Sequence, residues 1–455
     1  MSAILVSALA FVVAIGLLVA VHEFGHFWVA RRLGFKVLRF SIGFGRALLS
    51  RRGADGTEYV LAAIPLGGYV KLLDEREGPV PALEADRAFA RRPVLHRIAV
   101  LAAGPAANFV FAIVAFWVLF MHGVPGLEPV VGSVSAGTPA AQAGLARDDT
   151  LVSVAGRAVA TREAAVIALL EAMLDEGDIA LVVARPDGGE RHLTLRVAED
   201  RRRQLTEPGE LLRGLGFGFW VPPMPVVVGS LEPDGPAARA GLAVGDRIVA
   251  IDGVEIPEFM DFLHQVRARP GAALRLAVVR GDERRDIVVV ARSDEEGGQR
   301  IGRIGITPKG TVSFPDAMIT DQRFGPLAAI PRALDETWQK SVLTLRFLGR
   351  MITGDVSVKN ISGPINIAQY AGVTAIEGPA YFLGFLALIS ISLAVLNLLP
   401  VPILDGGQIL YQLAELLKGR PLSEEVQMLG QKLGIAVLVA LMGLAFYNDL
   451  SRLFG

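Results

Sequence analysis

Four long apolar segments dominate the pattern of hydrophobic and polar positions. They cover residues 3–21, 98–121, 381–399 and 433–447. An α-helix rises 1.5 Å per residue, so about 20 apolar residues cross the roughly 30 Å hydrocarbon layer of a membrane. The pattern therefore predicts four transmembrane helices. Buried helices of a soluble protein are the alternative, which weighs most for the short fourth segment.

Basic residues beside these segments predict their orientation. Arg31, Arg32, Lys36, Arg39, Arg46, Arg51 and Arg52 follow the first segment, Arg91, Arg92 and Arg97 precede the second, and Lys418, Arg420 and Lys432 lie between the third and fourth. Lys and Arg favour cytoplasmic loops, so residues 31–97 and the connection near 418–432 are expected in the cytoplasm. Residues 122–380 and both termini are then expected outside it. No basic residue precedes the first segment, which we interpret as an uncleaved span.

An internal repeat occupies the long outer stretch. Residues 132–156 read GSVSAGTPAAQAGLARDDTLVSVAG and residues 229–253 read GSLEPDGPAARAGLAVGDRIVAIDG, with 12 of 25 positions identical. This similarity predicts two copies of one domain of about 90 residues. The first copy has Arg147-Asp148 and Ala155 where the second has Val244-Gly245 and Asp252. We therefore expect less regular turns in the first copy.

A motif with metal-binding spacing follows the first apolar segment, His22-Glu23-Phe24-Gly25-His26. Residues four apart share one face of a helix, so His22 and His26 can hold one metal ion. Glu23 is placed to act as a general base toward a water molecule in the site. A catalytic zinc site usually has three protein ligands. The alternative interpretation is a polar helix end at the membrane interface, which would leave costly ionisable groups without a use.

The third ligand is expected from the motif Asn397-Leu398-Leu399-Pro400-Val401-Pro402-Ile403-Leu404-Asp405-Gly406-Gly407. The third span descends from outside, so Asp405 reaches the depth of His22 near the cytoplasmic face. Pro400 and Pro402 break the helix, and irregular backbone at membrane depth is tolerated where it lines a cavity. Asp405 as a helix cap is the alternative; Asp74, Glu75 and Asp449 occupy less constrained positions. Asn397 can donate to a peptide carbonyl or make an interhelical hydrogen bond.

These features together resemble the site-2 protease family of intramembrane zinc metalloproteases. The resemblance covers essentially the whole chain, and the repeats resemble PDZ domains of the circularly permuted bacterial type. It implies one zinc ion held by His22, His26 and Asp405, water activation by Glu23, and a substrate contact at Asn397. It also implies that Gly67, Gly68 and Tyr69 belong to a re-entrant β-hairpin that offers its edge to an extended substrate. An ordinary cytoplasmic hairpin is the alternative there.

The expected fold class is a polytopic α-helical membrane protein with four transmembrane helices, two tandem PDZ-like α+β domains on the outer side and a membrane-associated β-hairpin. The expected units are residues 1–121 with the first two spans, 122–220 and 221–312 with the PDZ-like domains, 313–380 with an amphipathic helix and connecting loop, and 381–455 with the last two spans. Residues 327–352 mix apolar and basic positions, so this helix is expected either on the outer membrane surface or against the repeats. Residues 362–366 predict only a turn.

The resemblance implies cleavage of transmembrane segments in single-span membrane proteins at the bacterial inner membrane. The implied substrate is an anti-sigma factor already trimmed on its periplasmic side, whose release starts an envelope stress response; remnant signal peptides are a further class. The PDZ-like domains would be periplasmic, the active site near the cytoplasmic face, and membrane lipid a partner. The PDZ grooves would either bind a peptide or exclude bulky substrates, because a strand edge can accept an extended peptide. A monomer is favoured.

Composition limits which ligands and which metal-binding side chains this protein can have. Hydrophobic residues make up 52% of the 455 positions and charged residues 20%, with a net charge of −1. That balance gives no global electrostatic reason to bind nucleic acid. The chain has no cysteine, so a metal site must use His and carboxylate, a set that suits zinc. Two other classes remain: a non-catalytic PDZ scaffold or receptor, and a metal transporter, which would need ligands along a path across the bilayer.

Overall fold

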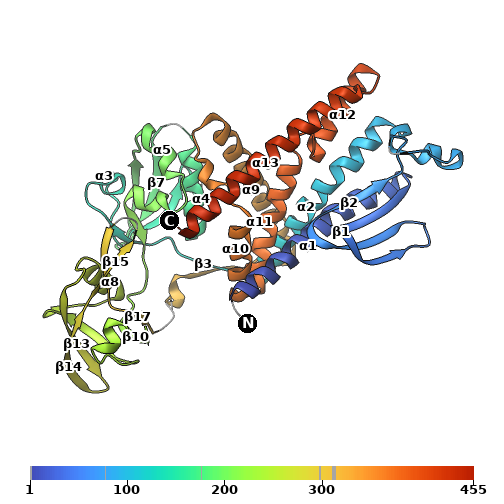
Figure 1. The fold of residues 1–455 in the computed structure, drawn as a ribbon. Helices are drawn as coiled ribbons and strands as arrows, with labels where there is room; N and C mark the ends of the chain where they lie inside the picture. Colours follow the sequence, from blue (N-terminus) through green and yellow to red (C-terminus); the bar gives the residue numbers. More distant parts are fainter. Residues whose placement is uncertain (1–2, 77, 176, 297–298, 310–313, 455) are drawn as a thin grey trace.

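The computed structural model describes residues 3–76, 78–175, 177–296, 299–309 and 314–454 (Figure 1). Within these residues, four helices are long and apolar enough to cross a membrane. They are α1 (Ala3–Arg32), α2 (Val94–His122), α11 (Pro379–Asn397) and α13 (Glu424–Phe454). The prediction of four candidate spans is therefore confirmed. The short fourth segment proves to be the centre of a 31-residue helix.

The helical region is built around α2. Helices α1, α11, α9 (Pro326–Thr353) and α12 (Asp405–Lys418) all contact it, and α10 (Pro364–Glu377) packs on α1. A Cβ added at Gly25 of α1 would lie 2.3 Å from the carbonyl oxygen of Ala103 in α2. Small residues let helix backbones approach closely where the hydrophobic effect between membrane helices is weak. The sequence pattern missed α10 and α12, of which only a turn and a helix break were expected.

Two long strands join α1 to α2. Strand β1 (Val37–Arg52) pairs antiparallel with β2 (Glu58–Leu72), with Ile42 opposite Gly68 and Arg52 opposite Glu58. Gly67, Gly68 and Tyr69 thus lie within β2; the side chains of residues 65 and 66 lie outside the described part. Two 3-10 turns, η1 (Ala82–Arg87) and η2 (Phe89–Arg91), lead into α2.

The first repeat, here the first unit (residues 129–220), surrounds a core that includes Leu151, Leu169 and Leu181. Its sheet has the order β6-β5-β7-β8, and β4 pairs separately with β9. The elements are β4 (Val131–Val134), α3 (Pro139–Ala143), β5 (Thr150–Val154), β6 (Arg157–Ala158), α4 (Arg162–Met173), β7 (Ile179–Ala184), β8 (Glu190–Leu195), α5 (Glu199–Leu205), α6 (Glu210–Leu215) and β9 (Phe217–Phe219).

The second repeat, the second unit (residues 224–309), has a core of its own with Ile248, Phe262 and Leu274. Its main sheet has the order β14-β13-β11-β10-β17, with β12 on β11, and β15 pairs with β16. The elements are β10 (Val226–Leu231), α7 (Pro236–Arg239), β11 (Arg247–Ile251), β12 (Val254–Glu255), α8 (Phe259–Arg267), β13 (Ala273–Arg280), β14 (Glu283–Val290), β15 (Arg292–Glu296), β16 (Gln299–Arg303) and β17 (Ile306–Pro308).

Both copies have a residue with positive φ at the same two turn positions. Asp148 (φ 66°) and Ala155 (φ 49°) are left-handed, as are their counterparts Gly245 (φ 95°) and Asp252 (φ 50°). The expectation of less regular turns in the first copy is therefore wrong. The sheet imposes the turn although Ala155 has no glycine freedom, at a cost of about 1–2 kcal/mol for an L-residue.

The first unit is attached to the helices through the segment after the second unit. Strand β18 (Ile319–Gln322), which follows η3 (Asp316–Met318), pairs with β3 (Val124–Leu127) at the end of α2. Helix α9 then buries Ala329 and Ala333 against the helices and sends Lys340 toward Glu163 of α4, 3.6 Å away. Packing against the repeat is thus observed for α9, and η4 (Val358–Asn360) connects it to α10.

Figure 1 places the second unit apart from the helices, beyond the first unit. The proposed units keep their status as predictions, and the expected boundary at 312–313 lies outside the described residues. The arrangement leaves the helical region and the strands β1 and β2 together at one end of the molecule. The motifs that contain His22 and Asp405 both lie in that region.

Candidate metal centre

Three possible metal-binding side chains converge between α1 and α12. His22 Nε2 lies 3.2 Å from His26 Nε2, and Asp405 Oδ2 lies 3.2 Å from His22 Nε2 and 3.4 Å from His26 Nε2. Both imidazoles are buried. The motif does not end its helix, because α1 continues to Arg32. Residues 22, 26 and 405 are thus brought together from opposite ends of the sequence.

These distances fit a zinc ion. Ligand atoms on a tetrahedral zinc with bonds of about 2.0–2.1 Å are about 3.3 Å apart, close to the three separations found here. Asp405 Oδ2 is buried and has no hydrogen-bond partner among the described residues. Such an oxygen is costly to bury unless a cation or donor satisfies it. The donor set of two imidazoles and one carboxylate therefore fits the metal that the sequence predicted.

One face of α2 supports the two histidines. His26 Nδ1 lies 2.7 Å from the carbonyl oxygen of Val100, and His22 Nδ1 lies 3.2 Å from the amide of Asn108. Between them, a Cβ on Gly104 would lie 2.2 Å from His26 Nε2 and 2.8 Å from His22 Cε1. A side chain at position 104 would therefore collide with both rings. None of these α2 residues was singled out from the sequence.

Glu23 lies beside the strands. It is buried in α1, and a Cβ on Gly68 of β2 would lie 2.9 Å from Glu23 Cγ and 2.6 Å from the carbonyl oxygen of Ser41. Gly68 thus permits the backbone of β2 to reach the side chain of the expected general base. Any larger residue at position 68 would separate the strand from α1.

Asp405 is positioned by the break between α11 and α12. Helix α11 ends at Asn397 and α12 begins at Asp405, with Leu404 as its N-cap residue. A Cβ on Gly406 would lie 2.2 Å from the carbonyl oxygen of Leu398, so the turn is tight. The carboxylate of Asp405 is close to the histidines, and Leu404, not Asp405, occupies the N-cap position.

An ion pair fastens α12 to α2. Arg97 donates to both carboxylate oxygens of Glu415, at 3.0 and 2.6 Å. The Arg97 side chain is 7% exposed and that of Glu415 17%. A bidentate, desolvated pair is directional, so it fixes how the helix that carries Asp405 lies against the helix that supports the histidines.

The remaining candidates have other surroundings. Gly67 is left-handed (φ 107°) and lies under the ring of Phe44, which also stacks on Tyr69 at 6.1 Å. Asn397 is half-buried at the end of α11, and its substrate contact stays a prediction. Three acids considered as ligands have other partners: Asp74 pairs with Arg76, Glu75 with Arg91, and Asp449 accepts backbone N–H groups near 363–366.

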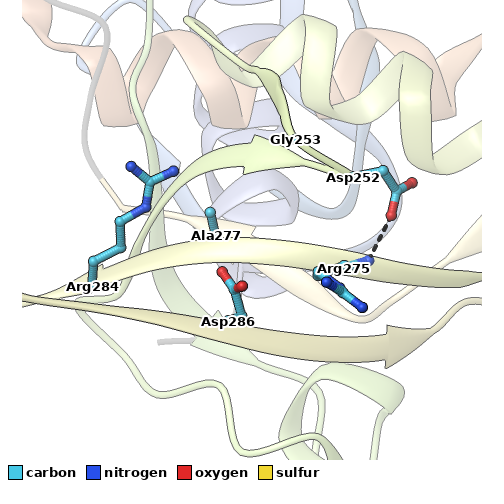
Figure 2. A pocket seen from close by; sticks show the side chains of 6 residues that line it. All are labelled: Asp252, Gly253, Arg275, Ala277, Arg284 and Asp286. Atoms are coloured by element: carbon cyan, nitrogen blue, oxygen red, sulfur yellow. Dashed lines mark hydrogen bonds between the residues drawn. The ribbon is translucent and has the colours of Figure 1, made fainter.

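A surface pocket of about 460 Å³ lies elsewhere, on the sheet of the second unit. Figure 2 shows Asp252, Arg275, Arg284 and Asp286 around it, with the Asp252 carboxylate bonded to the backbone N–H of Arg275. The pocket is lined by both acidic and basic side chains, and the carboxylate of Asp252 already accepts hydrogen bonds from Arg275 and Arg269. The buried donors His22, His26 and Asp405 therefore stay the candidate metal centre, and this pocket lies apart from them.

Comparison with known proteins identifies the class of enzyme. The chain matches the description "Peptidase family M50" over residues 10–441. It belongs to this peptidase family. It is 44% identical to "Regulator of sigma-E protease RseP" of Escherichia coli (strain K12), over 97% of this chain and 98% of that protein. It is 43% identical to "Protease RseP" of Yersinia pestis, over 100% of each. It is 42% identical to "Putative zinc metalloprotease" of Xylella fastidiosa (strain 9a5c), over 96% of this chain and 97% of that one.

The chain is therefore a zinc metalloprotease with four candidate membrane spans. The family resemblance recognised in the motifs is confirmed, and the scaffold and transporter hypotheses give way to an M50 peptidase. Among solved structures, a PDZ domain of an SdrC-like protein from Listeria monocytogenes is similar at 27% identity and a TM-score of 0.17, over 18% of this chain and 86% of that one.

Proposed function

We propose that this M50 peptidase cleaves transmembrane segments of single-span proteins, with one zinc ion held by His22, His26 and Asp405. The observation that carries the proposal is the convergence of these three donors inside a bundle of membrane-length helices, at separations that suit zinc. A buried centre of this kind serves a substrate that enters from the membrane. Irregular backbone between α11 and α12 lines such a centre without exposing polar groups to lipid.

A zinc ion held there would supply Lewis-acid polarisation and acidify water. In this proposal Glu23 takes a proton from the attacking water and returns it to the leaving amine. The edge of β2 near Gly68 holds the substrate extended, because a helical amide is shielded from attack. Asn397 donates to the scissile carbonyl as negative charge develops on its oxygen. Tyr69 and Gly67 shape the same edge.

The strands would sit at the membrane. Leu48, Leu49 and Ile64 are each at least half exposed, which a re-entrant, membrane-associated hairpin would account for, since lipid would cover these side chains. Basic residues near 31–97 support a cytoplasmic position for this region. The active site would then face the cytoplasmic half of the inner membrane.

The two outer units are proposed to be tandem PDZ-like domains on the periplasmic side. In each, a left-handed glycine, Gly216 (φ 82°) or Gly305 (φ 78°), directly precedes a strand, β9 or β17, at a sheet edge. Such an edge can take an extended peptide. Their bulk would also exclude substrates with large outer domains, which favours an anti-sigma factor that another protease has already trimmed, or a remnant signal peptide.

The test uses the purified full-length protein in detergent with a single-span substrate, either trimmed or carrying its outer domain. Glu23→Gln should retain zinc and lose cleavage by about 10²–10⁴-fold, because general acid–base catalysis contributes that much. His22→Ala should lose both zinc and cleavage. His122→Ala, at an exposed histidine on the far end of α2, is the matched control and should retain both.

Two outcomes would contradict the catalytic proposal, and a third would contradict the size filter. Cleavage by Glu23→Gln at the wild-type rate would show that Glu23 is not the general base. Cleavage by zinc-free wild-type protein would show that the reaction does not need the metal. Equal cleavage of the trimmed and untrimmed substrates would leave the catalytic assignment intact but refute the size filter.

A further inference from the structure

The two histidines differ in what holds their second ring nitrogen. His26 Nδ1 lies 2.7 Å from a backbone carbonyl, that of Val100. A carbonyl only accepts, so His26 must carry its proton on Nδ1 and present a free lone pair at Nε2. His22 Nδ1 faces a side-chain amide instead, that of Asn108, at 3.2 Å.

Asn108 is fully buried in the middle of α2. Its backbone carbonyl accepts from Ser390 Oγ of α11 at 2.9 Å, and Ser390 is also fully buried. With the amide nitrogen toward His22, the oxygen Oδ1 is buried without a hydrogen-bond partner among the described residues. A polar side chain inside a membrane helix is costly to bury without hydrogen-bond partners. The orientation of the Asn108 amide therefore decides which of its atoms is paired.

The orientation with nitrogen toward His22 conflicts with metal binding. If the amide donates to His22 Nδ1, a neutral His22 must carry its proton on Nε2, the atom that lies 3.2 Å from Asp405 Oδ2. A protonated Nε2 has no lone pair for a metal. The two ends of an amide occupy nearly the same space, so the position equally admits Oδ1 toward His22. That orientation gives the buried oxygen a donor and frees His22 Nε2.

We propose that Asn108 is a positioning residue that accepts the Nδ1–H of His22 through Oδ1 and thereby fixes the tautomer that binds metal through Nε2. The inference rests on the proposed zinc site. Val100 and Asn108, on one face of α2 and on either side of Gly104, then each accept the Nδ1–H of one histidine. Outer partners of this kind orient metal-binding histidines in proteins generally.

The first experiment measures zinc affinity by chelator competition in the purified full-length protein. Asn108→Leu, similar in size but without an acceptor, should bind zinc about 10–100-fold more weakly. Asn108→Asp restores an acceptor oxygen and should bind close to wild type. Ser390→Ala removes the neighbouring buried hydrogen bond without touching the amide and should also remain close to wild type.

The second experiment reads the tautomer directly. In metal-free protein with ¹⁵N-labelled histidine, the NMR shifts of His22 should report the proton on Nδ1 in wild type and in Asn108→Asp. In Asn108→Leu they should move toward the Nε2–H form that free imidazole prefers. A purely structural role for Asn108 would not change these shifts.

The outcomes separate this inference from the proposed function. If wild type binds no zinc, the proposed metal site fails. If wild type binds zinc and Asn108→Leu binds it equally well, the inference about Asn108 fails alone. If Asn108→Leu does not fold, an Nε2–H tautomer of His22 in the metal-free wild type overturns the inference, and an Nδ1–H tautomer supports it.

Discussion

The helical region and the outer units use polar side chains in opposite ways. Between the helices, buried polar side chains join one helix to another: Arg97 of α2 contacts α12, Asn108 of α2 contacts α1, and Ser390 of α11 contacts α2. The outer units carry many exposed ion pairs, such as Arg196 with Asp178. Exposed pairs stabilise proteins little, whereas a buried charge without its partner is strongly destabilising. Location, more than number, decides what each pair contributes.

The largest effect is expected at the buried pair of α2 and α12. Arg97→Met leaves Glu415, whose side chain is only 17% exposed, without its partner and should lower the free energy of unfolding by about 3–5 kcal/mol. The double variant Arg97→Met/Glu415→Leu removes both charges and should recover most of that loss. Thermal unfolding of the purified protein in detergent measures both. A single variant as stable as wild type would break the contrast with the outer units.

Next comes a buried carboxylate that occurs once in each outer unit. Asp246 accepts two hydrogen bonds from Arg280, at 2.7 and 2.8 Å, whereas its counterpart Asp149 lies 3.5 Å from Arg185 Nε. Asp246→Asn should therefore cost the second unit about 1–3 kcal/mol, and Asp149→Asn should cost the first unit less. Hydrogen exchange of each unit in the full chain gives both values. Equal losses would mean that the arginine contacts do not matter.

The same carboxylate predicts a pH dependence. The hydrogen bonds from Arg280 lower the pKa of Asp246 below the usual Asp pKa of about 3.9. A group whose folded pKa is lowered stabilises the protein above its unfolded pKa and loses that contribution as pH falls through the folded pKa. The second unit should thus hold this contribution at neutral pH and lose it below about pH 4. Hydrogen exchange across that range should show a smaller acid loss in Asp246→Asn than in wild type.

A smaller effect is expected at the left-handed turns. Ala155→Gly relieves a left-handed alanine and should stabilise the first unit by about 0.4–1 kcal/mol. The same change at its counterpart, Asp252→Gly, should destabilise the second unit, because the Asp252 carboxylate accepts from the backbone N–H of Arg275 and from Arg269. Resistance to proteolysis at increasing urea concentration measures both stability changes. Two changes of the same sign would show that the turns are not held as described.

The smallest effect is expected where the two regions meet at the surface. Lys359 pairs with Glu207 of the first unit at 2.9 Å, with a lysine side chain that is 65% exposed. Lys359→Ala should cost about 0.2–1 kcal/mol and less at high salt. Hydrogen exchange of the first unit at two salt concentrations measures this. A loss as large as that of Arg97→Met would contradict the ranking by burial.

Spacing along one helix made part of the site predictable. His22 and His26 lie one turn apart, so their shared face follows from helix geometry, and matching membrane depths pointed to Asp405. The α2 residues that contact the two histidines could not be predicted, because spacing along the sequence does not say which face of α2 packs against α1. The Gly, Pro and Asn that interrupt the second apolar segment were the available signal, since an Asn inside a span needs a reason.

The fold was predictable to a similar depth. Apolar length gave four spans, and the repeat gave two similar units, because both signals extend over many residues. The turn at Ala155 was misjudged because a local cost of about 1–2 kcal/mol is smaller than the packing of a whole sheet. Helices α10 and α12 were missed because their first residues, Pro364 and Asp405-Gly406, are typical of turns as well as of helix starts.

The donors at 22, 26 and 405 are also separated in time. A bacterial ribosome adds about 5–20 residues per second, so position 405 is made roughly 20–80 s after position 26 at that rate. Until then a nascent chain holds the two imidazoles of α1, supported by α2, but no third donor. On the proposed assignment, the third donor arrives only with the last helices, so their insertion is the step that completes the metal site.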